Sequence, residues 1–189
     1  MKRHPDIEVR SSETVFKGAI YDVVVDDVRL PSGLEQKLAV VDHNGAVAVA
    51  PVTDDGRLLL VRQYRHACGD WLVEVPAGRL EPGEDTLTAA KRELEEETGF
   101  RAKSWELLRA FFPAPGFCSE VITLYVATEL EAVPGGGLDC DSDEEFDYVR
   151  LTPAEVLASD NCDAKTLLAA SLLRSRVSET TSGSDSQSH

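Results

Sequence analysis

The chain has 189 residues, of which 42% are hydrophobic and 28% are charged, and its formal net charge is −15. That charge argues against a nucleic-acid partner, because a protein that binds phosphate backbones needs basic patches. No stretch approaches the roughly 18 apolar residues of a membrane span, and the first ten residues do not resemble a signal peptide, so we expect no membrane partner and a cytoplasmic location.

The first 44 residues predict a small antiparallel β element that precedes the main domain and serves in dimerisation. Alternating apolar residues predict strands over residues 20–25 and 36–41. Pro31-Ser32-Gly33 predicts the turn between them.

Residues 45–176 predict one α/β domain with a mixed sheet and flanking helices. Its predicted strands span residues 47–52, 57–64, 71–75, 105–112, 121–128 and 146–151. The first two are expected to form a hairpin at Asp54-Asp55-Gly56. Thr152-Pro153-Ala154-Glu155 has the capping-box pattern of a helix start, and a last helix is predicted over residues 164–176. The serine-rich segment 177–189 is predicted to be a disordered tail.

Residues 78–100 form the most strongly patterned segment, GRLEPGEDTLTAAKRELEEETGF. Apolar residues recur at helical spacing from Leu87 to Leu94 and predict a helix over residues 84–98. Gly99 then falls just beyond the helix, where a left-handed conformation is needed.

The predicted helix carries a group of carboxylates on one side. Glu93 and Glu97 are four residues apart and therefore project side by side, with Glu96 on the same flank. Two carboxylates about 5 Å apart repel by roughly 3 kcal/mol at an effective dielectric of about 20. A hard divalent cation such as Mg2+ removes this penalty, and Arg92 can orient Glu96 from one turn away. The alternative is a solvated acidic helix face, but Glu84 and the flanking glycines at their fixed distances favour a metal site.

The same segment matches the Nudix box, Gly-x5-Glu-x7-Arg-Glu-U-x-Glu-Glu-x-Gly-U, where U is a bulky aliphatic or aromatic residue, so the chain resembles the Nudix hydrolases. The resemblance implies an α/β/α sandwich with a mixed central sheet. It also implies Mg2+ as cofactor, with Mn2+ as a substitute. Glu93, Glu97 and the carbonyl of Ala77 match the metal ligands, and Glu96 matches a further ligand, direct or through water. Glu96 and Arg92 also match residues of the catalytic machinery.

Two further patterns resemble the ADP-ribose (ADP-sugar) pyrophosphatase branch of that family. Pro115 lies sixteen residues after Gly99 in Pro-Gly-Phe-x-x-Glu, which implies substrate contacts for Gly116 and Glu120, with a place in the shell of the metal as the other role for Glu120. An ordinary turn between strands is the alternative. The acidic segment 139–147 is similar to a mobile loop that supplies a catalytic glutamate, with a solvated loop as the alternative.

In that loop Glu145 is the closest match and Glu144 the second candidate. The resemblance also implies that the N-terminal strands exchange between the subunits of a homodimer. Tyr21 is then a candidate for stacking on adenine, and the alternative is an aromatic residue buried in the sheet.

The run Arg62-Gln63-Tyr64-Arg65 is similar to runs that line the substrate cleft in this branch. Arginines suit phosphate because they bind it in a bidentate manner, and strand alternation places Gln63 and Arg65 on one face. A structural salt bridge is the alternative for either arginine. Glu74, in Glu-Val-Pro-Ala-Gly, matches a glutamate near the substrate.

We therefore expect Mg2+-dependent hydrolysis of the pyrophosphate bond of ADP-ribose, or a related ADP-sugar, to AMP and a sugar phosphate. One alternative is hydrolysis of another small nucleotide, such as a nucleoside diphosphate sugar, NADH or a dinucleoside polyphosphate. The other is a module that binds ADP-ribose without cleaving it, although no position of the box is eroded. The four cysteines form no CxxC pair and are predicted to be free thiols.

Overall fold

The computed structural model describes the backbone of residues 4–134 and 147–182, and side chains as far as residue 176. The chain divides into two compact units. The first consists of Met1–Ala46 with Phe111–Ile122, and the second of Val47–Ala110 with Thr123–His189.

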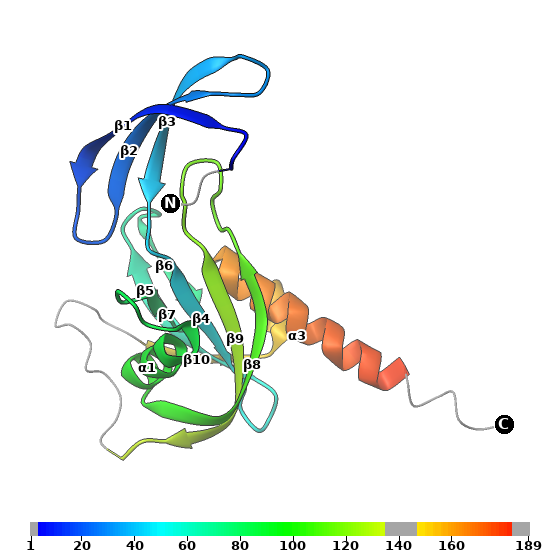
Figure 1. Cartoon of the computed structure of the whole chain (residues 1–189). Helices are drawn as coiled ribbons and strands as arrows, with labels where there is room; N and C mark the ends of the chain where they lie inside the picture. The colour runs from blue at the N-terminus through cyan, green and yellow to red at the C-terminus, as the bar shows by residue number, and fades with distance from the viewer. Residues whose placement is uncertain (1–3, 135–146, 183–189) are drawn as a thin grey trace. The chain divides into compact units, whose positions relative to one another are not determined.

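The first unit contains an antiparallel sheet of three strands in the order β1-β2-β3 (Figure 1). These are β1 (Glu8–Lys17), β2 (Asp22–Arg29) and β3 (Glu35–Asp42). The predicted antiparallel element and its turn are therefore confirmed. Strand β1 was not predicted individually, and its mostly exposed residues lack the regular apolar alternation that identifies a half-buried strand.

Residues 111–122 also belong to the first unit, although the sequence placed them in the main domain. The amide of Val41, near the end of β3, donates to the carbonyl of Phe117 at 2.8 Å, and the amide of Ser119 donates back to Val41 at 2.9 Å. These non-local hydrogen bonds attach the segment to β3.

The second unit contains two sheets. The first has the order β7-β4-β9-β8, with β7 (Ala77–Arg79), β4 (Ala46–Pro51), β9 (Ile122–Ala132) and β8 (Phe100–Phe111). The other has the order β10-β5-β6, with β10 (Asp147–Leu151), β5 (Leu58–Arg65) and β6 (Asp70–Glu74).

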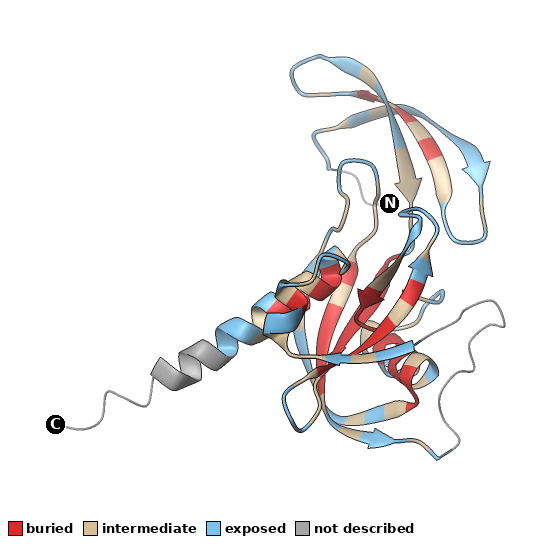
Figure 2. Cartoon of the chain, turned by 180° about the vertical axis from the view of Figure 1, so that it is seen from behind, coloured by how far each residue is buried: buried red, intermediate tan, exposed pale blue. Residues whose placement is uncertain are grey.

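The predicted hairpin between β4 and β5 is wrong as a strand pairing, because the two strands lie in different sheets. The turn itself forms, with Gly56 at φ 76° and a single bridge between Val52 and Leu58. All of β4 and the first half of β5 are buried. Consecutive buried residues point to opposite faces of a strand, so both faces of each strand are covered by other parts of the protein. Figure 2 shows this burial as red segments along the central strands of the second unit.

Helix α1 (Thr86–Thr98) begins two residues later than predicted. Asp85 is its N-cap, because its Oδ1 accepts hydrogen bonds from the amides of Leu87 and Thr88, both at 3.1 Å. Gly99 ends the helix with φ 69°, in the left-handed conformation that was predicted.

Two more helices follow β10. Helix α2 (Pro153–Leu157) starts with the predicted capping box between Thr152 and Glu155. Helix α3 (Ala164–Ser182) continues six residues past its predicted end, so part of the predicted tail is helical. None of the helices that the structure describes is long and apolar enough to cross a membrane.

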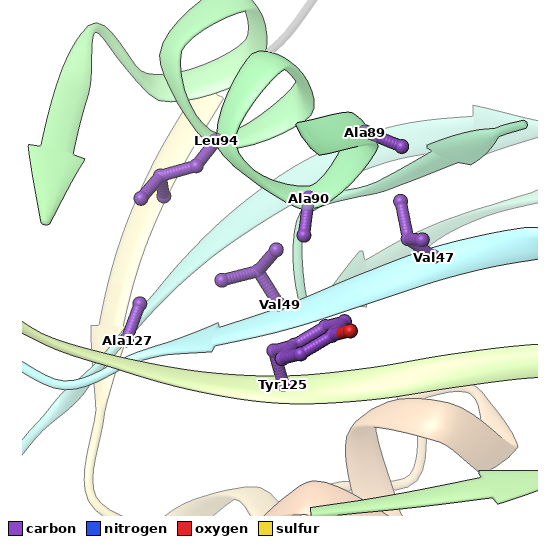
Figure 3. Close-up of a cluster of buried hydrophobic side chains, with 7 residues drawn as sticks. All are labelled: Val47, Val49, Ala89, Ala90, Leu94, Tyr125 and Ala127. Carbon is purple, nitrogen blue, oxygen red and sulfur yellow. The ribbon is translucent and has the colours of Figure 1, made fainter. Parts of the chain in front are cut away.

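Part of the core of the second unit is a cluster between α1 and the four-stranded sheet (Figure 3). The buried side chains come from α1, β4 and β9 and are Ala89, Ala90, Leu94, Val47, Val49, Tyr125 and Ala127. Helices α1 and α3 lie on opposite faces of the sheets (Figures 1 and 2). This layering confirms the predicted α/β/α class and leaves the carboxylate side of α1 away from the core.

Candidate functional site

Arg92 of α1 is bonded to three carboxylates. Its Nη1 donates to Glu93 Oε1 at 2.7 Å and to Glu96 Oε2 at 2.9 Å. Its Nε and Nη2 donate to the two oxygens of Glu84, each at 3.1 Å, and Nη2 also donates to the carbonyl of Arg79. The hydrogen bonds that Arg92 donates to Glu84, followed by the charge of Glu93, raise the pKa of Arg92 above its ordinary value. Three acidic side chains therefore share one permanent cation.

Glu84 thus has a defined place that the sequence did not reveal. It forms a fork with Arg92, and its Oε2 also accepts a hydrogen bond from the amide of Glu81 at 3.1 Å. The regular spacing of the box was a signal, but Glu84 lies before the N-cap of α1. Helical geometry could therefore not predict that it reaches Arg92.

The carboxylate of Glu93 occupies the space above Gly78. Only 8% of Glu93 is exposed, and this burial raises the pKa of its carboxyl group against the opposing charge of Arg92. A Cβ at position 78 would lie 2.0 Å from both Cδ and Oε1 of Glu93. Position 78 therefore requires glycine if Glu93 is to keep its place.

Glu97 lies against Ala77, the residue before Gly78 in β7. Its Oε2 accepts a hydrogen bond from the amide of Ala77 at 3.1 Å. The carboxylates of Glu93 and Glu97 thus meet consecutive residues of β7, next to the backbone predicted to contribute a carbonyl ligand.

The third box carboxylate, Glu96, is exposed and bonded to Arg92 instead. Among the side chains of residues 4–134 and 147–176, no three acidic, histidine or cysteine residues form a group that could hold a metal by themselves. Within this part of the chain, Glu93 and Glu97 are the carboxylates that lie against β7.

Arg65, which is partly exposed, forms an ion pair with the buried Glu74. Arg65 Nε and Nη2 donate to Glu74 Oε1 and Oε2, both at 2.7 Å, and Lys165 Nζ of α3 also donates to Oε2. Only 1% of Glu74 is exposed. Burial raises the pKa of Glu74, but the hydrogen bonds from Arg65 and the charge of Lys165 outweigh it and hold the pKa at about 2. This is the salt bridge that the sequence left open as the alternative for Arg65.

Lys165 was not predicted from the sequence. It is buried, and the next eight residues, 166–173, carry no charge. A run without charges indicates a buried helix, but the sequence does not show that Lys165 is buried with it or which carboxylates it meets.

Arg62 faces away from Arg65. Its guanidinium carbon lies 4.7 Å from the centre of the Trp71 ring, a cation–π contact. The regular pairing of β5 with β6 places Gln63, which is buried, on the same face as Arg65. The predicted alternation along β5 is therefore present.

Three of the remaining predicted site residues belong to the first unit rather than the second. Gly116, Glu120 and Tyr21 belong to the first unit, where Glu120 Oε1 is 3.7 Å from His43 Nδ1. Tyr21 is exposed rather than buried in the sheet and lies beside Phe16. Glu144 and Glu145 lie outside the described residues. The roles of all five stay predictions.

Comparison with known proteins gives one family. Residues 42–170 match the model of the NUDIX domain. The chain is 39% identical over 168 residues to an "ADP-ribose pyrophosphatase" of Bacillus subtilis (strain 168), covering 87% of this chain and 90% of the relative. It is 41% identical over 167 residues to a "Methanol dehydrogenase activator" of Bacillus methanolicus, covering 86% of this chain and 90% of the relative.

A solved structure titled "Crystal structure of ADP compounds hydrolase" superposes on this chain with a TM-score of 0.81 at 25% identity. The superposition covers 95% of this chain and 98% of that chain.

The low pKa of Glu74 predicts a stability that depends on pH. The folded-state pKa of about 2 lies below the ordinary value of 4.5, so the stabilisation is complete above about pH 5 and is lost as pH falls through 2. We expect the gap in unfolding free energy between wild type and Glu74→Gln to shrink by about 3 kcal/mol between about pH 6 and pH 2. Urea denaturation over this pH range measures it. Parallel curves for the two proteins would contradict the assignment.

Proposed function

Since this chain belongs to the Nudix hydrolase family, we propose that it hydrolyses ADP-ribose to AMP and ribose 5-phosphate with Mg2+ as cofactor. The single observation that supports this most strongly is the pair Glu93 and Glu97, which lie against Gly78 and Ala77. This pair occurs in a chain that is 39% identical to an ADP-ribose pyrophosphatase over 90% of the length of that relative.

The donor set fits a magnesium ion. Mg2+ prefers oxygen ligands and is commonly bound by one or two carboxylates together with substrate phosphates. Glu93, Glu97 and the carbonyl of Ala77 would hold it, with Glu96 as a further ligand, direct or through water. When bound, the metal supplies positive charge to the pyrophosphate and lowers the pKa of the attacking water.

The side chains of this site have separate tasks. Arg92 fixes Glu93 and Glu96 before substrate arrives, and Glu84 fixes Arg92, so the carboxylates need little rearrangement during the reaction. A glutamate takes the proton of the attacking water, and we propose Glu145 or Glu144, or else a box glutamate, for this role.

On the substrate side, Arg65 is the proposed contact to the diphosphate, whereas a contact from Arg62, on the opposite face of β5, stays a prediction. Arg65 uses two of its five N–H groups on Glu74, and its side chain is 40% exposed. The exposed part of the guanidinium suits an anion, because arginine binds phosphate oxygens with charge and with directed hydrogen bonds.

A second candidate function is hydrolysis of a wider set of ADP derivatives. The superposition on an ADP compounds hydrolase favours it. A module that binds without cleavage fits less well, since every specified position of the box is present.

A turnover panel tests these proposals. Purified protein is assayed with ADP-ribose, ADP-glucose, UDP-glucose, NADH and diadenosine polyphosphates, each with Mg2+ and with chelator alone. We expect ADP-ribose to have the highest kcat/KM and turnover to stop without a divalent cation. Water labelled with 18O identifies the phosphorus that is attacked. Binding of ADP-ribose without turnover of any compound would favour the non-catalytic module.

Removal of charge from the metal-binding carboxylates should abolish most of the activity. Loss of a residue that merely supports a metal ligand reduces activity about 10- to 100-fold, so Glu93→Gln and Glu97→Gln should each lower kcat by more than about 100-fold. Glu95→Gln is the matched control on the same helix, because the side chain of Glu95 pairs with Arg101 on the surface and not with Arg92 or β7. This variant should retain wild-type kcat. Equal activities in all three variants would exclude the assignment.

Gly78→Ala should separate activity from stability. The new Cβ would meet the flexible end of Glu93, so the side chain moves while the fold persists. Displacement of a catalytic group by about 1 Å can reduce the rate about 100-fold, and we expect that loss in kcat. The melting temperature should change little. A variant with normal kcat would show that the position of Glu93 over Gly78 is not needed.

We also propose a homodimer formed through the first unit. Its sheet and turns expose several large apolar side chains, which are Val15, Phe16, Ile20, Leu34 and Leu38. Exposed apolar surface of this kind is typical of an interface. Light scattering should give twice the chain mass for wild type and a smaller mass for Phe16→Asp. A wild-type monomer at micromolar concentration would contradict the proposal.

A further inference from the structure

We propose that Lys165, at the start of α3, is a positioning residue that acts through Glu74 to fix the guanidinium of Arg65 for the substrate diphosphate. The inference rests on the proposed function, because it assigns a role within that reaction. Lys165 itself is buried and bonded to Glu74 and Asp163.

Glu74 connects the two cations. Its Oε1 accepts a hydrogen bond from Arg65 Nε, and its Oε2 accepts from both Arg65 Nη2 and Lys165 Nζ. Two parallel hydrogen bonds fix both the position and the plane of a guanidinium. Since Glu74 is almost fully buried, water cannot easily replace either partner.

Lys165 is in turn fixed by the first turn of α3. Its Nζ also donates to Asp163 Oδ2, and Asp163 Oδ1 accepts a hydrogen bond from the amide of Thr166 at 3.0 Å. The hydroxyl of Thr166 accepts a hydrogen bond from the amide of Val75 at 2.9 Å. The helix start is thus attached to the residue after Glu74, two positions before Ala77.

The charges explain why a cation is required at position 165. Arg65 and Lys165 balance Glu74 and Asp163, so the group is neutral as a whole. Without Lys165, two carboxylates would compete for Arg65, whose guanidinium already experiences the charge of Asp163. Arg65 also experiences the charge of Glu97, one of the proposed metal ligands. If the side chain of Glu74 were less firmly held, Arg65 could shift towards Asp163 or Glu97.

Arg65 keeps donors for an anion in this arrangement. Its Nε and one N–H of Nη2 bond to Glu74, and within the described part of the chain its guanidinium makes no other hydrogen bond. The exposed side of the guanidinium therefore points its remaining donors away from Glu74. Lys165 sets where those donors lie without touching the substrate itself.

The kinetic test uses the full chain with ADP-ribose and Mg2+. Lys165→Met removes the charge while filling a similar volume. If Arg65 binds the diphosphate equally in the ground state and the transition state, KM rises and kcat is nearly unchanged. We expect KM to rise about tenfold and kcat to change less than about threefold, as for a loss of uniform binding.

A double-mutant cycle separates positioning from stability. In the Arg65→Ala background, Lys165→Met should add no further rise in KM, because the residue it positions is gone. A merely structural lysine would lower the melting temperature and the active fraction, and hence kcat, in both backgrounds while KM stayed constant. Lys103→Met is the matched control, since Lys103 is 61% exposed and pairs with Glu131 on the surface. It should have wild-type KM and kcat.

Lys165→Gln keeps the test decisive if the methionine variant does not fold. Its amide can still donate to Glu74, so an intermediate rise in KM is expected. Suppose that wild type hydrolyses ADP-ribose. If the folded Lys165 variants then have wild-type KM, or raise KM as much in the Arg65→Ala background as in wild type, the inference is overturned. The proposed function stands in either case. If wild type hydrolyses no compound of the panel, the proposed function fails and the inference fails with it.

Discussion

The site depends on one guanidinium that three carboxylates share. Without a cation among them, Glu84, Glu93 and Glu96 would repel one another, and Glu93 would also be buried as an uncompensated charge. Arg92 supplies that charge from the same helix turn, and its planar donors set the orientation of each carboxylate. Gly78 completes the arrangement because its missing side chain leaves the space that Glu93 occupies.

The buried face of α1 explains why Arg92 and its carboxylate partners are held in a rigid arrangement. Ala89, Ala90 and Leu94 are fully buried against β4 and β9, so the helix cannot rotate without opening the core (Figure 3). Because an α-helix has a fixed repeat, packing on one face determines where the residues on the other face project. Packing of small apolar side chains thus places Glu93 and Glu97 against β7.

Two arginines of this unit follow the same physical rule. Arg92 is held by Glu84 and Arg65 is held by Glu74, in each case through hydrogen bonds to both carboxylate oxygens. A long, flexible side chain loses much entropy when it is ordered, and a fork of this kind supplies that order in the folded protein. The two pairs differ in burial, since Glu74 is nearly inaccessible and requires the second cation of Lys165.

The sequence by itself determined the features that depend on neighbours along the chain. Helix α1 with its end at Gly99, the capping box of α2 and the antiparallel N-terminal strands all follow from local spacing and turn chemistry. Only the tertiary structure decided which distant segments meet. It separated strands 47–52 and 57–64 into two sheets, brought Glu84 to Arg92 and placed Lys165 beside Glu74. Such pairings depend on burial from both faces and on charges distant in sequence, which no local pattern encodes.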